Sequence, residues 1–400
     1  MSIYRLENVI QTYAWGSRTA IAELMGQPSP SLHPQAELWM GTHPKGPSMV
    51  TMDAMRMPLA ALIGQRPADI LGADVDRRFG GRLPFLFKVL AAARPLSIQA
   101  HPDKRQAALG FARENALGKA LDAPERNYRD DNHKPEIICA LSRFWSLNGF
   151  RAPDVAASLL EPVLPAVLAP AWRDLKSGGD LGAFFRAVLT LPADQRQTAA
   201  RQVWEMAAPK ARSSDVYRWM VELAREYPAD MGVLSPALLN LICLEPGQAM
   251  YLPAGQLHAY LDGVGIELMA NSDNVLRGGL TPKHVDVTEL LAVGRFQPSA
   301  VEIIRTRPVG PGEWRYDCPA VEFSLGLIRI VDGESYVSPK DRNVQLLLCT
   351  EGEGVLTPSD SAGALPLHKG ESVMVPAVLA GYRISGHLTI YKATVPPVDQ

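Results

Sequence analysis

Gly247-Gln-Ala-Met-Tyr-Leu-Pro-Ala-Gly-Gln-Leu-His258 is the most specific stretch of the chain and the one that says most about its architecture. Gly247 opens a turn, residues 249–252 form a short strand, and Pro253 together with Gly255 makes a tight turn. The chain then returns with His258 facing into a small barrel. The stretch therefore predicts a β-barrel that carries a histidine in its interior.

The spacing of glycine, five residues, Pro-x-Gly, two residues and histidine resembles the second motif of the cupin jelly rolls, where that histidine is a metal ligand. Gly370-Glu-Ser-Val-Met-Val-Pro376 repeats the first half of the motif, but Val378 and Gly381 stand in place of its second glycine and its histidine. Residues 296–400 also alternate as strands do and contain Gly-rich turns. We therefore expect a second, metal-free jelly roll in this part of the chain.

A row of polar side chains lies at the end of a predicted buried strand, in Arg94-Pro-Leu-Ser-Ile-Gln-Ala-His-Pro-Asp103. Ser97, Gln99 and His101 are two residues apart, so an extended chain points all three to one face. A buried amide or imidazole needs a partner, and a metal ion is a good one. A solvated edge strand explains the same row and, for Gln-Ala-His alone, is the commoner explanation.

Two lysines and a glutamate also lie within or at the start of predicted apolar strands. Pro135 biases Lys134 toward an extended conformation and Glu136 begins a hydrophobic strand, so Lys134 and Glu136 share a face. A surface salt bridge would account for them equally well. Lys88 lies inside the apolar strand candidate 83–90, where a lysine loses its proton or finds an anion, unless it snorkels to the strand end.

The pattern of hydrophobic residues changes twice along the chain. Apolar residues recur at helical spacing in residues 151–235, where Trp204 and Trp219 are expected in the core, and strand-like alternation dominates on either side. Asp103 is expected to cap a polar helix that runs to about residue 115. We predict a mainly β protein with a helical domain, that is, two cupin-type jelly-roll domains and an all-α insert. The expected division is a metal-binding catalytic cupin domain (1–150 with 236–295), a helical domain (151–235) and a C-terminal jelly roll (296–400).

The composition is that of an ordinary globular protein. Its 400 residues carry a formal net charge of −2 and are 47% hydrophobic. We expect no nucleic-acid partner, no membrane association and no leader segment. The cysteines are far apart and fit no Cys-x-x-Cys site, so we interpret them as reduced core residues of a cytoplasmic protein. They are Cys139, Cys243, Cys318 and Cys349.

Four of these polar residues form a plausible ligand set. Gln99, His101, Glu136 and His258 together offer an amide oxygen, two imidazoles and a carboxylate. Such a set suits a borderline divalent ion, most often zinc, with an open position for water or substrate. Each residue is ambiguous alone, but four that can share one barrel interior favour a metal site.

Across nearly its whole length the sequence resembles the type I mannose-6-phosphate isomerases. The resemblance is carried by Tyr13-Ala-Trp-Gly16, Leu96-Ser-Ile-Gln-Ala-His-Pro-Asp103, Asn132-His-Lys-Pro-Glu136, Tyr251-Leu-Pro-Ala-Gly-Gln-Leu-His-Ala-Tyr260 and Asn271-Ser-Asp-Asn-Val-Leu-Arg-Gly-Gly-Leu-Thr-Pro-Lys-His-Val-Asp286. In that family the positions matching Gln99, His101, Glu136 and His258 bind one zinc ion, and the position matching Arg277 is catalytic. The resemblance also implies a zinc-bearing cupin domain, a helical domain and a C-terminal jelly roll.

The implied reaction is the reversible conversion of mannose 6-phosphate and fructose 6-phosphate, in carbohydrate metabolism and GDP-mannose biosynthesis. A proton moves between carbons 1 and 2 through an enediolate, which requires a base and positive charge at the developing oxyanion. Arg277, followed by two glycines that permit close approach, would stabilise the enediolate. Lys134 is the candidate base, with a zinc-bound water and His101 as rivals.

Other residues take supporting roles under the same resemblance. Asp273 is a candidate for assisting ring opening. Lys88, Ser97 and Lys283 are candidates for holding the phosphate, because cations and a hydroxyl suit a dianion. The expected partner is a small sugar phosphate, and we expect a monomer.

Two other classes of protein share parts of this pattern. A metal cupin oxygenase acting on a small organic acid would more often use iron and a His-x-His motif, where this chain has Gln99-Ala-His101. A non-catalytic sugar-binding cupin would have lost its metal ligands or Arg277, and both are kept here.

Overall fold

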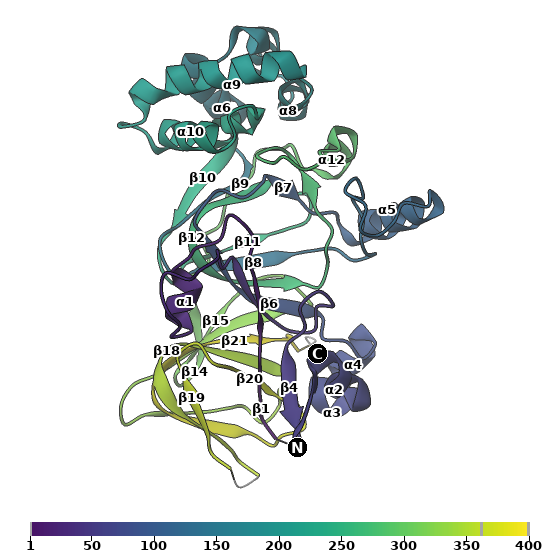
Figure 1. Cartoon of the computed structure of the whole chain (residues 1–400), viewed down its shortest axis with the longest axis vertical. Helices are drawn as coiled ribbons and strands as arrows, with labels where there is room; N and C mark the ends of the chain where they lie inside the picture. Colours follow the sequence, from purple (N-terminus) through teal and green to yellow (C-terminus); the bar gives the residue numbers. More distant parts are fainter. Residues whose placement is uncertain (1, 361–362, 398–400) are drawn as a thin grey trace.

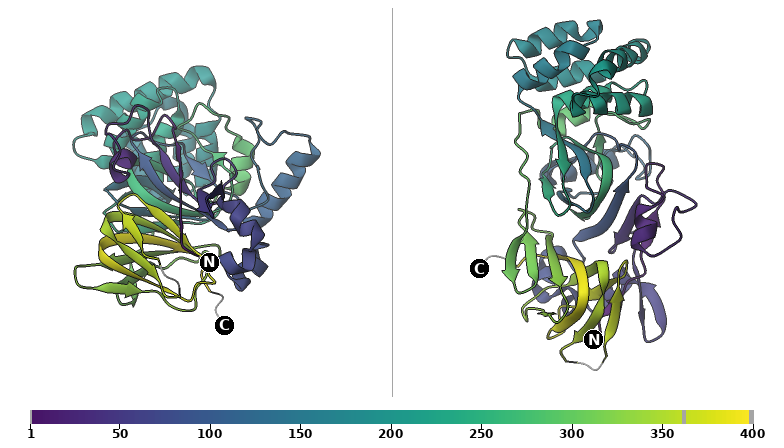
Figure 2. Two further views of the ribbon diagram at one scale, coloured as in Figure 1. Left: turned by 60° about the horizontal axis from the view of Figure 1, so that its bottom comes forward. Right: turned by 90° about the vertical axis from the view of Figure 1, so that its left-hand side faces the viewer.

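The structure is a computed structural model that describes residues 2–360 and 363–397. Three parts follow one another along the long axis of the molecule: a helical region, a first β-structure in the middle, and a second β-structure below it (Figure 1). The right-hand view of Figure 2 shows the same order, with an extended segment running down one side to the lower part. The predicted fold class, mainly β with a helical region, is confirmed.

The middle part is a ten-stranded sheet, which we call the first jelly roll. Its strands are β2 (Val9–Gln11), β3 (Glu37–Met40), β6 (Phe85–Ala92), β7 (Gln99–Ala100), β8 (Glu136–Ala140), β9 (Phe144–Phe150), β10 (Leu239–Leu244), β11 (Ala249–Leu252), β12 (His258–Ala270) and β13 (Leu276–Arg277). The 13-residue strand β12 organises this sheet, because it pairs with β6, β7, β8 and β9. Residues from four other strands therefore meet along one continuous segment.

The helical region occupies residues 153–238, close to the predicted range. Its helices are α6 (Pro153–Leu160), η1 (Glu161–Val163), η2 (Ala166–Leu168), α7 (Ala169–Lys176), α8 (Leu181–Leu189), α9 (Ala193–Ala207), η3 (Ala208–Lys210), α10 (Asp215–Glu226), η4 (Met231–Leu234) and α11 (Ser235–Leu238). Its core is continuous with Leu147 of β9 and Leu261 of β12, so the region packs on one end of the first jelly roll. Trp219 is buried as predicted, but Trp204 is 39% exposed, because small residues form the buried face of α9.

Smaller elements cover the remaining edges. They are α1 (Ala20–Leu24), the hairpin β4 (Met49–Met52) and β5 (Met55–Pro58), α2 (Leu59–Gln65), α3 (Pro67–Leu71), α4 (Ala73–Phe79), α5 (Lys104–Ala116) and α12 (Val287–Val293). The predicted helix after Asp103 is confirmed as α5, which projects from the side of the molecule (Figure 1). Asp103 accepts a hydrogen bond from the Gln106 backbone and donates its own N–H to the Gln106 side chain, a capping box.

The lower part is a nine-stranded sheet, which we call the second jelly roll. Its strands are β1 (Tyr4–Arg5), β14 (Arg307–Gly310), β15 (Glu313–Tyr316), β16 (Ser324–Ile330), β17 (Ser335–Val337), β18 (Gln345–Pro358), β19 (Leu365–His368), β20 (Ser372–Val375) and β21 (Tyr382–Thr394). Strand β1 comes from the opposite end of the chain and pairs with β20. The predicted division placed these residues in the first jelly roll, which is wrong, because two residues of extended chain carry no signal about their pairing partner.

The two jelly rolls share one hydrophobic core. Phe87 of β6 and Ile137 of β8 lie in the same buried cluster as Phe323 and Leu346 of the second jelly roll. The segment that links the jelly rolls adds to this contact, since Ile304 bridges to Ala249 of β11. The second jelly roll is therefore packed against the back of the first one.

The described residues contain free cysteines, as expected. Cys139 and Cys349 lie in the core, but Cys243 and Cys318 are partly exposed, so the expectation of a core position is wrong for these two. None of the helices in the described part of the chain has both the length and the apolar character needed to span a bilayer.

Replacing Phe323 by alanine should lower the free energy of unfolding by about 3–5 kcal/mol, because the ring is fully enclosed in the shared core. Urea unfolding followed by tryptophan fluorescence measures the change. Val337→Ala is the matched control: Val337 belongs to the same jelly roll but is exposed, and its loss should cost less than about 0.5 kcal/mol. Equal effects of the two substitutions would contradict a shared core.

Candidate functional site

The strand register lines up four polar residues across the interior of the first jelly roll. His258, at the start of β12, lies opposite Asn148 of β9 on one side and Gln99 of β7 on the other. Gln99 in turn lies opposite Arg277 of β13. Because directly opposed residues share a face of a sheet, these side chains form one row. Two predicted ligands and the predicted catalytic arginine are thereby neighbours.

The turn before His258 has the predicted form. Gly255 adopts a φ of +78°, and a Cβ there would lie 2.9 Å from the carbonyl oxygen of Val293. Glycine is the residue that tolerates both constraints. The turn thus delivers His258 to the interior, where it is nearly fully buried.

His101, Glu136 and His258 form a buried cluster beneath this row. Nε2 of His101 is 3.5 Å from Oε1 of Glu136, and Nε2 of His258 is 3.4 Å from Oε2. Their potential ligand atoms all lie within 4.8 Å of one another, the arrangement that a metal ion needs. The structure brings together three of the four predicted ligands here, and Gln99 lies directly beside His258.

Hydrogen bonds orient both imidazoles. Nδ1 of His101 lies 2.7 Å from the carbonyl oxygen of Asn274, and Nδ1 of His258 lies 3.0 Å from that of Gln256. A carbonyl only accepts, so each Nδ1 carries the proton and each Nε2 presents a lone pair to Glu136. Nε2 of His101 is buried and has no hydrogen-bond partner among the described residues. Two lone pairs and a carboxylate converging on one point fit a divalent cation.

The electrostatics of the cluster favour the ligand forms of these groups. Burial, together with the charge of Lys134, lowers the pKa of His101 to about 4. Burial alone would raise the pKa of Glu136, but Lys134 and His101 outweigh it and hold that pKa well below its usual range. At neutral pH His101 is neutral and Glu136 is charged, as metal ligands must be.

Lys134 is the nearest cation to the cluster. Its Nζ lies 2.8 Å from Oε1 of Glu136, and the side chain is almost fully buried. The prediction that Lys134 and Glu136 share a face is confirmed, and the alternative of a surface salt bridge is wrong, because both residues are enclosed.

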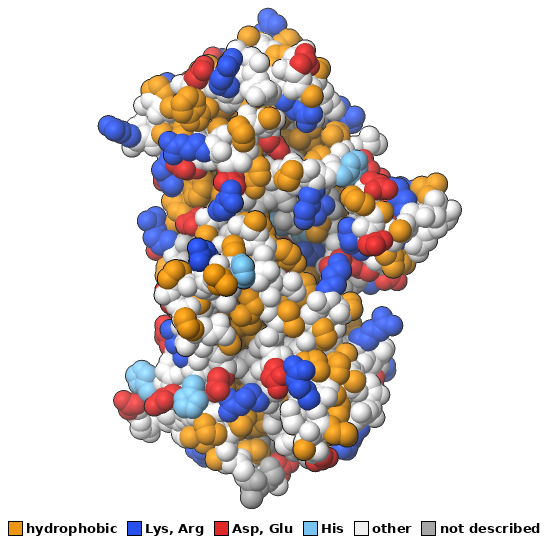
Figure 3. Space-filling model, viewed as in Figure 1, with side chains coloured by type: hydrophobic (Ala, Val, Ile, Leu, Met, Phe, Trp, Pro, Cys, Tyr) orange, Lys and Arg blue, Asp and Glu red, His pale blue; other side chains and the backbone are white. Residues whose placement is uncertain are grey.

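A hollow of about 900 Å³ lies beside the cluster. Four predicted site residues line it: Ser97, Gln99, Arg277 and Lys283. The helical region forms another wall, with Tyr227 and Asp230 among the lining residues. Figure 3 shows the surface hollowed beneath the helical region, with Lys and Arg side chains along the rim. The helical region therefore helps to form the pocket.

Positive charge accumulates around this hollow. Burial and the charge of Arg129 lower the pKa of Arg277, and burial with the charges of Arg277 and Arg129 lowers the pKa of Lys283. The ion pairs of the described residues include none of these three cations. Cations that lie close together without acidic partners among the described residues form a site suited to a multivalent anion.

The loop that carries Arg277 is held from the helical region. The carboxylate of Asp230 accepts a hydrogen bond of 3.1 Å from the backbone N–H of Thr281. Gly279, at a φ of +122°, passes so close that a Cβ there would lie 3.1 Å from Asp230 Oδ1. Gly279 therefore serves close packing against the helical region. That the glycines also let the Arg277 guanidinium approach a bound molecule stays a prediction.

Lys88 is paired with buried carboxylates and does not line the hollow beside Arg277. Its buried ammonium donates to Glu267 at 2.8 Å and lies 3.7 Å from Glu37. Tyr260 donates to the other oxygen of Glu267 at 3.0 Å. The charge of this buried lysine is therefore balanced by carboxylates of the protein rather than by a bound phosphate. Glu267 was not singled out from the sequence, although an acid within an apolar strand, opposite Lys88, is the signal that could have found it.

Asp273 is also displaced from the pocket. Its carboxylate lies 2.7 Å from Nζ of Lys45 and 3.3 Å from Nε2 of His43, and it lines a separate hollow of about 840 Å³. These neighbours, opposing the effect of burial, hold the pKa of Asp273 far below its usual value. It is placed to hold His43 and Lys45 rather than to touch a molecule beside Arg277.

Known proteins match the chain from end to end. Residues 3–153 match the family model of the phosphomannose isomerase type I catalytic domain, and residues 321–395 match that of the mannose-6-phosphate isomerase cupin domain. Mannose-6-phosphate isomerase of Salmonella typhimurium is 41% identical over 385 residues, which cover 96% of this chain and 97% of that protein. The Mus musculus enzyme is 32% identical over 429 residues and covers 98% of each.

Solved structures of mannose 6-phosphate isomerases also match the fold of this chain. A zinc-bound mannose 6-phosphate isomerase superposes with a TM-score of 0.90 at 38% identity, covering 99% of this chain and 100% of that one. The chain belongs to the type I phosphomannose isomerase family. The predicted resemblance is thus confirmed.

One residue, Asn274, connects several parts of the site. Its carbonyl accepts from His101, and its side-chain oxygen accepts from the backbone of Arg129 at 2.6 Å. Its amide group donates to the carbonyls of Asp130 and Asn132, both at 2.9 Å. Asn274 therefore ties the loop before Lys134 to the loop before Arg277. Asn274 could not be singled out from the sequence, because an asparagine in a polar loop is common.

Asn274→Asp should weaken binding of a divalent ion to the cluster by about 10–100-fold, because it replaces two donated hydrogen bonds by a carboxylate facing carbonyl oxygens. Competition with a chelating dye measures the affinity. Asn271→Asp is the matched control, since Asn271 lies in the same loop but its side chain donates to Leu83 rather than to the loop before Lys134. Equal metal affinities in the two variants would show that Asn274 does not support the metal site.

Proposed function

We propose that the protein is a zinc-dependent isomerase that interconverts mannose 6-phosphate and fructose 6-phosphate through an enediolate. One observation carries the proposal: the His101–Glu136–His258 cluster lies beside a hollow whose cations Arg277 and Lys283 have no acidic partners among the described residues. A metal site alone would suit many reactions. A metal site beside an uncompensated cationic pocket suits a phosphorylated substrate with an oxygen to be polarised.

Ser97 and Lys283 are the proposed phosphate ligands. Both line the hollow, and a hydroxyl with an ammonium suits a phosphate dianion. Lys88 is not included, because moving its ammonium to a phosphate would leave Glu267 buried and unpaired. With the phosphate held at one end, the sugar carbons would lie toward Gln99 and Arg277.

Arg277 is the proposed stabiliser of the enediolate. Its guanidinium belongs to the same row as Gln99 and lines the hollow, so it can donate charge-assisted hydrogen bonds to an oxyanion there. A developing negative charge would also relieve the repulsion between Arg277 and Arg129.

Lys134 is the proposed carrier of the proton between carbons 1 and 2, through Nζ. It is the cation nearest to the cluster, 2.8 Å from Glu136. His101 is less suited to this role, because Nδ1 donates to Asn274 and Nε2 faces Glu136. Both of its nitrogen atoms are therefore engaged.

Gln99, His101, Glu136 and His258 are the proposed ligands of a single Zn²⁺. The ion, when bound, supplies Lewis acidity that polarises substrate oxygens. The chain itself supplies the buried ligands His101, Glu136 and His258, and backbone carbonyls of Asn274 and Gln256 accept hydrogen bonds that fix both imidazoles.

Removing the metal tests the proposal directly. Dialysis against a chelator should abolish isomerase activity on mannose 6-phosphate, and added Zn²⁺ should restore it, because the cluster is the proposed source of Lewis acidity. A coupled assay of fructose 6-phosphate formation measures both steps. Lack of activity in folded, fully zinc-loaded protein would sink the proposal for this substrate.

Arg277→Ala should reduce kcat by about 10²–10³-fold while leaving the zinc content unchanged, because an oxyanion donor is lost and no metal ligand is touched. Steady-state kinetics and metal analysis of the same preparation provide the two readouts. Arg105→Ala, which removes an exposed arginine of α5, is the control and should leave both unchanged. Loss of zinc from the Arg277 variant would show that the residue has a different role.

A further inference from the structure

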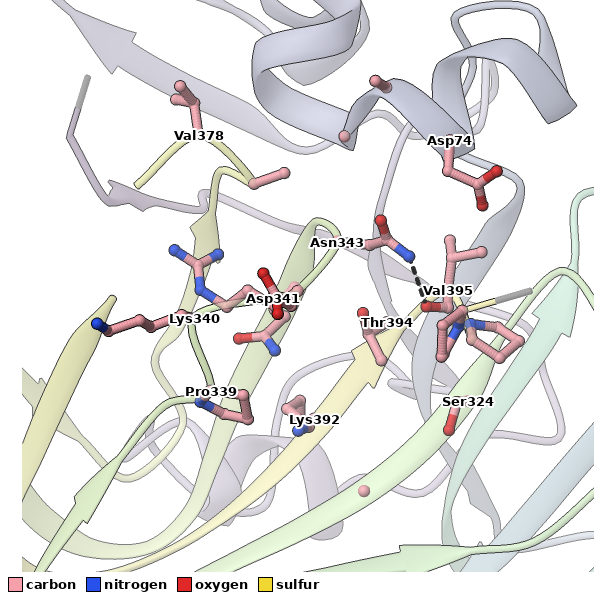
Figure 4. Close-up of a pocket in the computed structure, with 18 of the residues that line it drawn as sticks. Asp74, Ser324, Pro339, Lys340, Asp341, Asn343, Val378, Lys392, Thr394 and Val395 are labelled. Atoms are coloured by element: carbon pink, nitrogen blue, oxygen red, sulfur yellow. Dashed lines mark hydrogen bonds between the residues drawn. The ribbon is translucent and has the colours of Figure 1, made fainter. Parts of the chain in front are cut away.

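The second jelly roll contains a hollow of its own. It measures about 930 Å³ and opens between the sheet and helices α3 and α4 (Figure 4). Lys392 and Thr394 of β21 and Ser324 of β16 face it from adjacent strands, and Lys340 and Asp341 approach it from a loop (Figure 4). This hollow lies in a different jelly roll from the His101–Glu136–His258 cluster.

Buried polar groups form its floor. The ammonium of Lys392 donates to one oxygen of Glu313, and the hydroxyl of Tyr336 donates to the other at 2.8 Å. Lys392 and Glu313 are each only 7% exposed, yet both line the hollow. Enclosing an ion pair in a barrel costs solvation and is not required for packing, because apolar residues of similar volume would serve as well or better.

The same three-residue arrangement occurs in the first jelly roll. There Lys88 donates to one oxygen of Glu267, and the hydroxyl of Tyr260 donates to the other. Both lysine–glutamate–tyrosine groups are buried. In the second jelly roll, Lys392 and Glu313 of this group also line the hollow.

The two hollows are also lined by several of the same polar residue types. The first presents a serine, a glutamine, an arginine, a threonine and a lysine, namely Ser97, Gln99, Arg277, Thr281 and Lys283. The second presents the same five residue types, namely Ser324, Gln345, Arg342, Thr394 and Lys340. A pocket that offers hydroxyls, an amide and two cations suits a ligand with several hydroxyl groups and a negative charge.

Charge around the second hollow leaves room for an anion. Its acids Asp69 and Asp74 are paired with Arg66 and Arg77. Glu313 is paired with Lys392. Among the described residues, Lys340 and Arg342 have no ion-pair partner to offset them, and Asp341 is the one lining acid that is likewise unpaired. Arg342 donates to carbonyl oxygens of Pro376 and Leu379, while its Nε is buried without a partner.

The second hollow has no metal site beside it among the described residues, so it is not suited to the metal-assisted reaction proposed for the first hollow. The described residues around it include no cluster of His, Cys, Asp and Glu side chains that could hold a metal ion, in contrast to the first jelly roll. It can bind a ligand of the same kind but cannot polarise its oxygens in the same way.

We propose that the hollow of the second jelly roll is a non-catalytic binding site for a phosphorylated hexose. The choice of ligand class rests on the proposed function, because it is argued from the correspondence with the first hollow. An occupant would contact α3 and α4 as well as the sheet, and so would bridge two parts of the chain.

Calorimetric titration of the full-length, zinc-loaded chain with fructose 6-phosphate and glucose 6-phosphate tests the site. The background is the Arg277→Ala/Lys283→Ala double variant, in which binding to the first hollow is suppressed. A remaining binding event is expected. Ser324→Trp, which fills the second hollow without removing a hydrogen bond seen in the described structure, should abolish that event. Lys340→Glu should weaken it by about tenfold or more.

The matched control is Lys369→Glu, the same charge reversal at an exposed lysine of the same jelly roll that does not line the hollow. It should leave binding unchanged. Absence of binding in the folded double variant, or binding insensitive to both Ser324→Trp and Lys340→Glu, would overturn the proposal. The isomerase assay on the unaltered chain separates the two ideas: loss of the proposed function there, with hexose phosphate binding still dependent on Ser324 and Lys340, would leave this site standing.

Discussion

Burial of the Glu136 carboxylate is the constraint on which the site depends. A charged carboxylate inside a barrel is stable only if positive or hydrogen-bonding groups surround it. Here Lys134 lies at 2.8 Å and the imidazoles of His101 and His258 at about 3.5 Å. Lys134 stabilises the charge, whereas the two imidazoles, each donating from Nδ1 to a backbone carbonyl, direct a nitrogen lone pair at the carboxylate. The buried carboxylate of Glu136 and the two imidazoles that face it therefore form a cation-binding centre.

Strand β12 (His258–Ala270) makes this arrangement possible. It places His258 beside Gln99 at one end and Glu267 opposite Lys88 further along. The helical region contributes from outside the sheet, since Asp230 holds the loop that follows Arg277. The site is thus assembled from the β7 segment, the helical region and β12, which lie far apart in the sequence or in different elements, and its precision depends on their packing.

Local patterns predicted much of the fold. The capped helix after Asp103, the tight turn at Gly255 and the helical texture of residues 153–238 are short-range features, which depend on a few neighbouring residues. The pairing of β1 with β20 and the exposure of Trp204 were missed. Both depend on contacts with distant parts of the chain, about which local sequence says nothing.

The sequence by itself determined which residues could act as ligands, because Gln99, His101, Glu136 and His258 stand in spacings that a jelly roll turns inward. Only the tertiary structure decided what the other charged residues do. Lys88 and Asp273 have the chemistry of functional residues, but each is paired with an opposite charge. Lys283 faces an open hollow and has no such partner among the residues that the structure describes. The physical reason is that the free energy of a charge depends on its nearest partners and on its access to water. Both are properties of the folded chain.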